Sequence, residues 1–319
     1  MPPRRYLPWL LSFALAMLAA LAFGSGEIVW SELLPGGTGA SEAIFWQLRF
    51  PRVLTAAAVG GTLAVVGAIL QTMLRNPLAD PFLIGVSSAS ATGTVLALAA
   101  GLGQGRFVTS AMAAFGTLVF LDSVAYRRHR FSDHHLLVAG VAMTYLFSAI
   151  TGLVIALSDS QTTRGLMFWL MGGFSDLEPW AAWLSAGVML VCTSSLLRRG
   201  SELDILAAGD ETAHVLGVRP HALRRELFLI CSLMVGIAVA TAGGIGFVGV
   251  LVPHIARLVC GISHRAILLL SALGGATLTV LADTFARTAM APQEIPVGLI
   301  TALLGAPFFL YQLHCGRAL

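Results

Sequence analysis

Long apolar runs alternate with short polar connections along almost the whole 319-residue sequence. An α-helix rises 1.5 Å per residue, so about 20 apolar residues cross a hydrocarbon core of about 30 Å. The pattern therefore predicts an all-α polytopic membrane protein with about ten transmembrane helices. The predicted spans cover residues 6–23, 52–74, 82–102, 107–126, 135–157, 179–197, 226–242, 245–260, 266–287 and 295–313.

Two connections are longer than neighbouring spans require. Residues 158–178 begin polar and end aromatic, which predicts a short helix at the membrane interface. Residues 198–226 form the longest polar stretch; Gly209 and Gly217 with Pro220 divide it into two short helices, the second capped by Asp210. Such a pair favours a docking surface, with a plain linker as the alternative. The other connections are short, so residues 1–319 are predicted to form a single transmembrane domain.

The arginines indicate the orientation of the spans, because cytoplasmic connections collect positive charge. An even number of spans puts both termini on one side, and a cytoplasmic N-terminus places thirteen arginines inside and five outside. The five outside are Arg49, Arg52, Arg106, Arg164 and Arg287. Arg4 and Arg5 precede the first run as in a signal peptide, but no A-x-A site follows, so this run is predicted to be a retained span.

The composition agrees with a membrane protein. Apolar residues make up 57% and charged residues 11% of the chain, the net charge is +3, and the mean hydropathy is +0.84. Soluble domains carry about 25% charged residues. A soluble enzyme, a nucleic-acid binder, a disordered scaffold and a disulfide-stapled secreted protein are thereby excluded. The four cysteines form no CxxC pair and are expected to be small buried hydrophobes.

Charged residues inside the predicted spans are few, and such charges usually serve a function. Asp283 and Arg287 are four residues apart on one helix face and can pair. The sequence has no HExxH, GxSxG or phosphate-loop motif, so an intramembrane enzyme is disfavoured and any ATP must bind to another chain. No ladder of His, Asp or Cys crosses the membrane. We therefore expect no metal site, and a large wrapped cargo in preference to a bare ion.

Small residues follow one face of two predicted spans. In span 135–157 they recur at i+4 spacing, and in span 295–313 they are mostly glycine and alanine. They are Gly140, Thr144, Ser148, Gly152, Gly298, Ala302 and Ala306. Such stripes permit close helix packing, or they line a smooth pathway for cargo; both interpretations remain open.

Five segments, in order, resemble the signatures of FecCD-type permeases, the membrane subunits of type II ABC importers for iron–siderophore, haem and vitamin B12. The longest is RNPLADPFLIGVSS at residues 75–88. The others are WLMGG at 169–173, GFVG at 246–249 with VPHIAR at 252–257, ADTFAR at 282–287, and EIPVG at 294–298 with GAPFF at 305–309. The resemblance extends from about residue 45 to the C-terminus.

The resemblance implies a type II ABC importer permease fold and a bacterial inner-membrane location. It implies a homodimer whose central pathway is lined by the two striped spans. Two ATP-binding subunits would dock on the cytoplasmic side and one periplasmic substrate-binding protein on the other. The chain itself would be no enzyme and would bind no cofactor, with ATP and Mg²⁺ held by the partner ATPase.

The resemblance also assigns roles to individual residues. Arg49, Arg52 and Arg287 match positions that receive the binding protein's glutamates. Asn76 and Leu78 match the cytoplasmic gate, and beside them Asp133 and His134 stand where the vitamin B12 permease has small hydroxyl residues. The candidates for coupling to the ATPase are Leu206, Gly209, Asp210, Glu211, Leu216, Gly217 and Val218.

The expected cargo is an iron chelate, with iron–siderophore first and haem second. A cobalamin importer is the alternative within the family. A secondary transporter driven by an ion gradient is the rival from another class, and it would need acidic residues at mid-membrane that the sequence hardly offers. A membrane anchor would need neither the gate motif nor the small-residue stripes.

Overall fold

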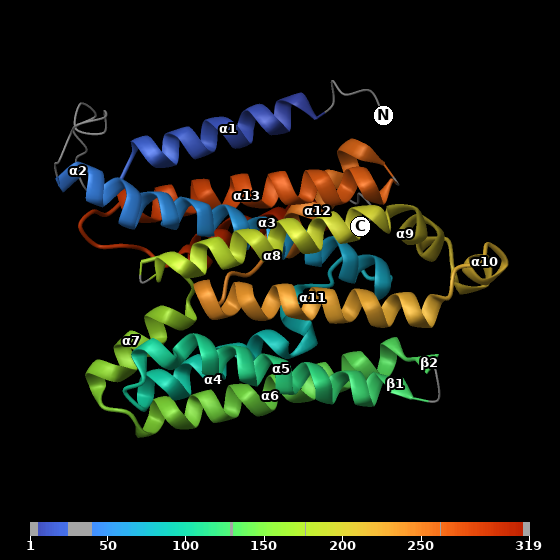
Figure 1. Cartoon of the computed structure of the whole chain (residues 1–319), viewed down its shortest axis with the longest axis horizontal. Coiled ribbons are helices and arrows are strands. Elements are labelled where there is room, and N and C mark those ends of the chain that lie inside the picture. Colours follow the sequence, from blue (N-terminus) through green and yellow to red (C-terminus); the bar gives the residue numbers. More distant parts are fainter. Residues whose placement is uncertain (1–5, 25–39, 128–129, 176, 262, 315–319) are drawn as a thin grey trace.

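The computed structural model describes residues 6–24, 40–127, 130–175, 177–261 and 263–314, so Arg4 and Arg5 lie outside the described residues. Most helices run side by side along the long axis (Figure 1). The helices and strands are α1 (Leu7–Ala22), α2 (Ala40–Ala43), η3 (Ile44–Arg49), α3 (Phe50–Met73), η4 (Pro81–Ile84), α4 (Val86–Ala99), η5 (Gly103–Gly105), α5 (Arg106–Ala125), β1 (Tyr126–Arg127), β2 (Arg130–Phe131), α6 (Asp133–Leu157), α7 (Ser160–Leu170), α8 (Pro179–Arg198), α9 (Gly200–Ala207), α10 (Asp210–Val215), α11 (Pro220–Ala242), α12 (Val248–Cys260), α13 (His264–Thr288) and α14 (Val297–His314).

Six described helices are long and apolar enough to cross a membrane. They are Ser41–Met73, Arg106–Ala125, Asp133–Leu157, Pro179–Arg198, Pro220–Ala242 and His264–Thr288. The other four predicted spans correspond to shorter apolar helices, Leu7–Ala22, Val86–Ala99, Val248–Cys260 and Val297–Tyr311. The structure therefore confirms a helical membrane protein.

Local backbone geometry explains why two of these helices are short. The predicted span 82–102 begins with the 3₁₀ turn η4, and Gly85 then adopts a left-handed φ of 74° before α4 starts. The predicted span 245–260 opens with residues outside any helix, and Phe247, with φ of 66°, precedes α12. A left-handed residue redirects the chain and cannot continue a helix.

Helix α3 forms the centre of the fold, and nearly all its residues are buried. It packs on α13 where Gly60 and Gly275 face each other, and on α12 where Gly67 meets Gly249; a Cβ at any of these positions would overlap a neighbouring atom. Glycines let membrane helices approach closely and gain dispersion contacts. Helices α4, α5 and α6 form a second group, joined to the first by α11 (Figure 1).

The two long connections fold as predicted, with corrections at their ends. Helix α7 confirms the helix expected in 158–178, and Asp159 caps it by accepting from the backbone N–H groups of Gln161 and Thr162. Helices α9 and α10 confirm the pair expected in 198–226. Pro220, however, starts α11, so the connection ends at residue 219. Asp210 is the first residue of α10 and makes no cap, since Gly209 precedes it with φ of 119°.

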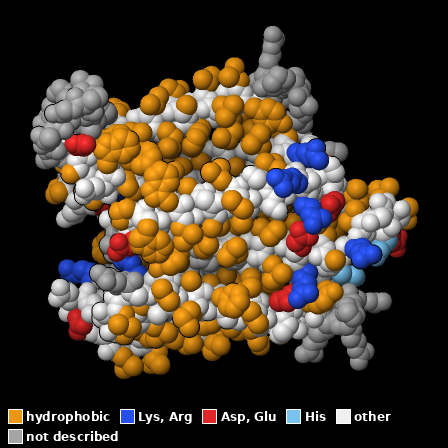
Figure 2. All heavy atoms as spheres, in the orientation of Figure 1, with side chains coloured by type: hydrophobic (Ala, Val, Ile, Leu, Met, Phe, Trp, Pro, Cys, Tyr) orange, Lys and Arg blue, Asp and Glu red, His pale blue; other side chains and the backbone are white. Residues whose placement is uncertain are grey.

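A short β-hairpin between α5 and α6 departs from the all-α prediction. Tyr126 pairs with Phe131 and Arg127 with Arg130 in antiparallel register. The surface separates polar from apolar chemistry (Figure 2). Hydrophobic side chains cover the bundle, while Arg, Asp and Glu gather toward the end that carries α9, α10 and the hairpin. The opposite end carries α2 and α7. We call these the hairpin end and the α7 end.

Candidate functional site

A buried ion cluster occupies the α7 end. The Arg52 guanidinium lies 2.8 Å from Asp283 Oδ1 and 2.8 Å from Glu294 Oε1. Asp283 is 1% exposed, and its predicted pair with Arg287 is the longer contact at 3.7 Å. Burial alone would raise the pKa of Glu294, but hydrogen bonding and the charge of Arg52 lower it below its usual value. The cluster joins α3, α13 and the segment before α14.

The other two predicted docking arginines hold the end of α1. Arg49 donates to the carbonyl oxygens of Leu21 and Ala22 at 2.9 and 3.1 Å, and Arg287 donates to that of Ala20. The last carbonyls of a helix have no partner within it and carry partial negative charge. These contacts give a physical reason for positive charge at this end. Both side chains are at most 5% exposed.

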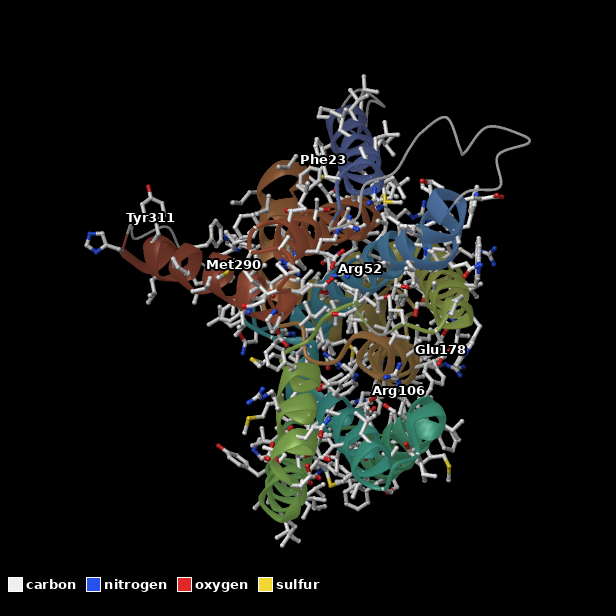
Figure 3. The ribbon with its side chains drawn as sticks, turned by 90° about the vertical axis from the view of Figure 1, so that its left-hand side faces the viewer. Phe23, Arg52, Arg106, Glu178, Met290 and Tyr311 are labelled. Atoms are coloured by element: carbon white, nitrogen blue, oxygen red, sulfur yellow. The ribbon has the colours of Figure 1, made fainter. Side chains whose placement is uncertain are left out.

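A cavity of about 470 Å³ opens beside the cluster. Its wall includes Arg52, Arg106, Trp169, Glu294 and residues 172–175. Figure 3 looks onto this end and places Arg52 near its centre, with Arg106 and Glu178 below. A second cavity of about 370 Å³ is lined by Arg49, Arg52 and Arg287 among others. The three predicted docking residues thus meet around one hollow, with their guanidinium groups bound internally.

The predicted gate residues lie toward the hairpin end. Asn76 Oδ1 accepts from the Leu78 backbone N–H at 2.9 Å, which closes a tight turn after α3. Both residues are exposed. Asp133 and His134 start α6, where Ser132 caps the helix. The gate candidates therefore come from two elements, the turn after α3 and the first turn of α6.

Arginines link the predicted gate residues to the predicted coupling segment. Arg224, 3% exposed, donates to both carboxylate oxygens of Asp210 at 2.8 Å, and its Nε lies 3.4 Å from Asp133. Arg75 reaches Asp210 at 2.6 Å. The hydrogen bonds from Arg224 lower the pKa of Asp210. Asp210 and Asp133 were predicted; Arg224, which joins them, was not.

A second polar chain joins α9 to the end of α3. Asp204 Oδ1 lies 2.7 Å from His264 Nδ1, and His264 Nε2 lies 2.8 Å from the Thr72 hydroxyl. The ring is almost buried, and the Asp204 carboxylate also accepts from the His264 backbone N–H at 2.8 Å. These hydrogen bonds end at Thr72, two residues before Leu74, where α3 ends and the turn that holds Asn76 and Leu78 begins.

The remaining coupling candidates are of two kinds, those packed against the protein and those exposed at its surface. Leu206 is a buried residue of α9, and Gly209 and Val218 are half-buried. Glu211, Leu216 and Gly217 are exposed, and beside them Val215 is 86% exposed. An apolar tip of this kind on a polar end of a membrane protein marks a surface for protein contact.

The small-residue stripes also contain both packed and exposed residues. Gly140 is buried against the Gly85 turn, and Gly298 packs on the backbone at Met171 and Gly244. Ser148 and Gly152 are exposed along α6, while the other members are half-buried: Thr144, Ala302 and Ala306. Close packing therefore accounts for Gly140 and Gly298, and a pathway along the exposed members stays a prediction. Among the described residues no group of three metal-ligating side chains occurs.

Comparison with known proteins identifies the family. The model of the FecCD transport family matches residues 10–314. The chain belongs to the FecCD transport family. This FecCD member is 38% identical over 321 residues to the vitamin B12 import system permease protein BtuC of Citrobacter koseri, covering 98% of this chain and 96% of the relative. It is 39% identical over 323 residues to the same protein of Escherichia coli, covering 97% and 96%.

A solved structure supports the assignment. An inward-facing conformation of a metal-chelate type ABC transporter matches with a TM-score of 0.85 at 32% identity, covering 98% of this chain and 99% of the other. The resemblance drawn from the five sequence segments is confirmed. The FecCD chain is an ABC importer permease and no enzyme, and the ion-gradient carrier is excluded.

The ion pairs of three arginines in this FecCD permease could not be predicted from its sequence. Arg224 binds Asp210, Arg225 binds Asp122 at 2.7 Å, and Arg199 bridges Glu202 and Glu226. Only Arg199–Glu202 is local, at i+3. The others join residues up to 103 positions apart, and one sequence contains no signal for such pairs.

Proposed function

We propose that this FecCD permease carries cobalamin or a closely related metal chelate across the bacterial inner membrane, driven by ATP. The observation that carries the proposal is the near full-length similarity to permeases named for vitamin B12 import. The relatives favour the cobalamin alternative over the iron–siderophore expectation.

The proposed orientation puts both termini and the hairpin end in the cytoplasm. Two ATPase subunits, which hold ATP and Mg²⁺, would receive the exposed tip around Val215 and Leu216. Arginine placement supports this orientation. A second copy of the permease would complete the pathway along α6 and α14.

The proposed role of Arg49, Arg52 and Arg287 is to attract the carboxylates of a periplasmic binding protein. In the free permease these arginines already bind oxygen acceptors. Docking would therefore exchange internal acceptors for external ones, which suits a contact that must form and release in each cycle. Arginine is suited to such exchange because its planar group offers five donors.

Uptake into proteoliposomes tests the function. The permease is reconstituted with its cognate ATPase and binding protein, and radiolabelled cobalamin, haem and iron–siderophore are supplied separately, with and without ATP on the ATPase side. ATP-dependent accumulation of cobalamin is expected. If only an iron chelate accumulates, the proposed cargo is wrong. If a proton gradient drives uptake without ATP, the proposed ATP-driven mechanism is wrong.

Arg52→Gln tests the docking role when the affinity of the binding protein for the reconstituted permease is measured at several salt concentrations. We expect weaker binding of the binding protein, with a reduced dependence on salt, because charge attraction between proteins is screened by ions. Arg164→Gln, on the exposed side of α7, is the matched control. Equal salt dependence in wild type and Arg52→Gln would contradict docking through this residue.

A further inference from the structure

Arg224 forms ion pairs with both the coupling helix α10 and the first turn of α6. It lies in the second turn of α11, and its side chain is 3% exposed. On one side it meets Asp210, and on the other it meets Asp133. An arginine this deeply buried needs acceptors, and both of its acceptors belong to elements that are expected to move during transport.

The two contacts are unequal. Asp210 accepts two hydrogen bonds of 2.8 Å from the terminal nitrogens of Arg224. The Arg224 Nε atom lies 3.4 Å from Asp133 Oδ2, the oxygen next to the unmet Oδ1, and no hydrogen bond forms. Within the described part of the chain, Arg224 Nε and Asp133 Oδ1 are both buried and without a hydrogen-bond partner. A buried donor thus faces a carboxylate that it does not bond.

This arrangement is poised between two states. Charge-assisted N–H···O bonds are usually about 2.7–2.9 Å long, so a shift of about half an ångström would close the contact. Unmet buried polar atoms in native proteins call for an explanation, and a second conformation that satisfies them is one. Movement of α6 relative to α11 would form or break this bond while the Asp210 bonds persist.

We propose that Arg224 is a positioning residue that connects the coupling helix to the gate, with its bond to Asp133 formed in one gate state and broken in the other. The inference rests on the proposed function, since it concerns how ATP use drives the gate. Arg224 stays fixed to α10 through Asp210, so displacement of α10 by the ATPase is passed to the start of α6. Arg75, which also binds Asp210, ties the turn after α3 to the same carboxylate.

The test measures coupling instead of activity alone. Arg224→Gln and Asp133→Asn are compared with wild type for cargo accumulated per ATP hydrolysed in proteoliposomes. Asp133→Asn leaves the Asp210 pair intact, so it reports on the link even if Arg224→Gln folds poorly. Arg225→Gln is the matched control, because Arg225 is the next residue of α11 and binds Asp122 of α5. We expect the ratio to fall at least about fivefold in the first two variants and to stay unchanged in the control.

A second readout does not depend on the cargo. A cysteine at Leu78, which is 48% exposed, is introduced after replacement of the four native cysteines, and its labelling rate by an impermeant thiol reagent is measured with and without ATP. The rate should respond to ATP in wild type and lose that response in Asp133→Asn. If cobalamin is not taken up but the labelling rate of Leu78→Cys still responds to ATP, the proposed cargo is wrong and the proposed link is unaffected.

Two outcomes overturn the proposal. If transport and hydrolysis fall in parallel, so that the ratio is kept, Arg224 is only a structural residue. If Leu78→Cys responds to ATP equally in wild type and Asp133→Asn, or in neither, the link does not operate the gate.

Discussion

Every basic side chain of this permease other than histidine is arginine. The chemistry of the guanidinium group explains why arginine can occupy buried positions. A guanidinium can bind several oxygens at once, as Arg52 binds Asp283 and Glu294. The sequence predicted the pair of Asp283 and Arg287 from i+4 spacing. It could not predict Arg52 as the nearer partner, because 231 positions separate Arg52 from Asp283.

Asp80 in the signature segment gives a prediction about pH. Burial raises the pKa of Asp80 to about 6, although a hydrogen bond from the Phe82 N–H opposes the rise. A carboxyl whose folded pKa exceeds its unfolded value of about 4 stabilises the fold when protonated. Stability from this group is therefore full below about pH 4 and is lost as pH rises through about 6. Asp80→Asn, which keeps the acceptor for Phe82, should remove that part of the slope.

Thermal unfolding in detergent between pH 4 and pH 7 measures the effect. The unfolding temperature of Asp80→Asn should change less with pH than that of the wild type. Parallel curves for the two proteins would show that Asp80 titrates normally in the folded state.

At the scale of the element, hydrophobic runs located the helices well and their ends poorly. Span 226–242 begins six residues earlier as α11, because Pro220 fits the first turn of a helix. Polar residues such as Arg224 and Arg225 then lie on α11, where run length alone could not place them. Their charges are satisfied by tertiary partners, which a hydropathy pattern does not contain.

The close approach of α3 and α13 gives a prediction about packing. A Cβ at Gly60 would overlap the Gly275 carbonyl oxygen, so Gly60→Ala should separate the helices and destabilise the protein by about 1–3 kcal/mol. Gly116→Ala is the control: Gly116 is helical and open, and alanine there should stabilise by about 0.4–1 kcal/mol. Unfolding midpoints in detergent compare the two. A tolerated Gly60→Ala would contradict the tight α3–α13 contact.

At the scale of the molecule, one flank remains largely uncovered. Helix α6 has few buried residues, and α14 projects sideways with Tyr311 near its tip (Figure 3). These are the two helices that the family resemblance assigns to the dimer pathway. The stripe pattern drew attention to both helices, but it could not separate packing residues such as Gly140 from exposed ones such as Ser148.

Cysteine cross-linking tests which flank meets the second copy. In a background without native cysteines, Ser148→Cys on α6 should yield a covalent dimer with a bifunctional thiol reagent. Ser12→Cys on α1, exposed on the opposite side of the bundle (Figure 1), should stay monomeric. Denaturing gels read the result. Cross-linking through position 12 instead would place the dimer contact on the other flank.

The sideways projection of α14 has a consequence for biogenesis. A ribosome makes this helix after all the other described helices, and the proposed dimer needs it on both sides. Pairing must therefore follow synthesis of α14 in each chain, so two subunits that already contain the other described helices have to find each other by diffusion in the bilayer. An unpaired subunit would meanwhile leave much of α14 uncovered. Because pairing joins two copies, the rate of dimer formation would depend on the square of the subunit concentration.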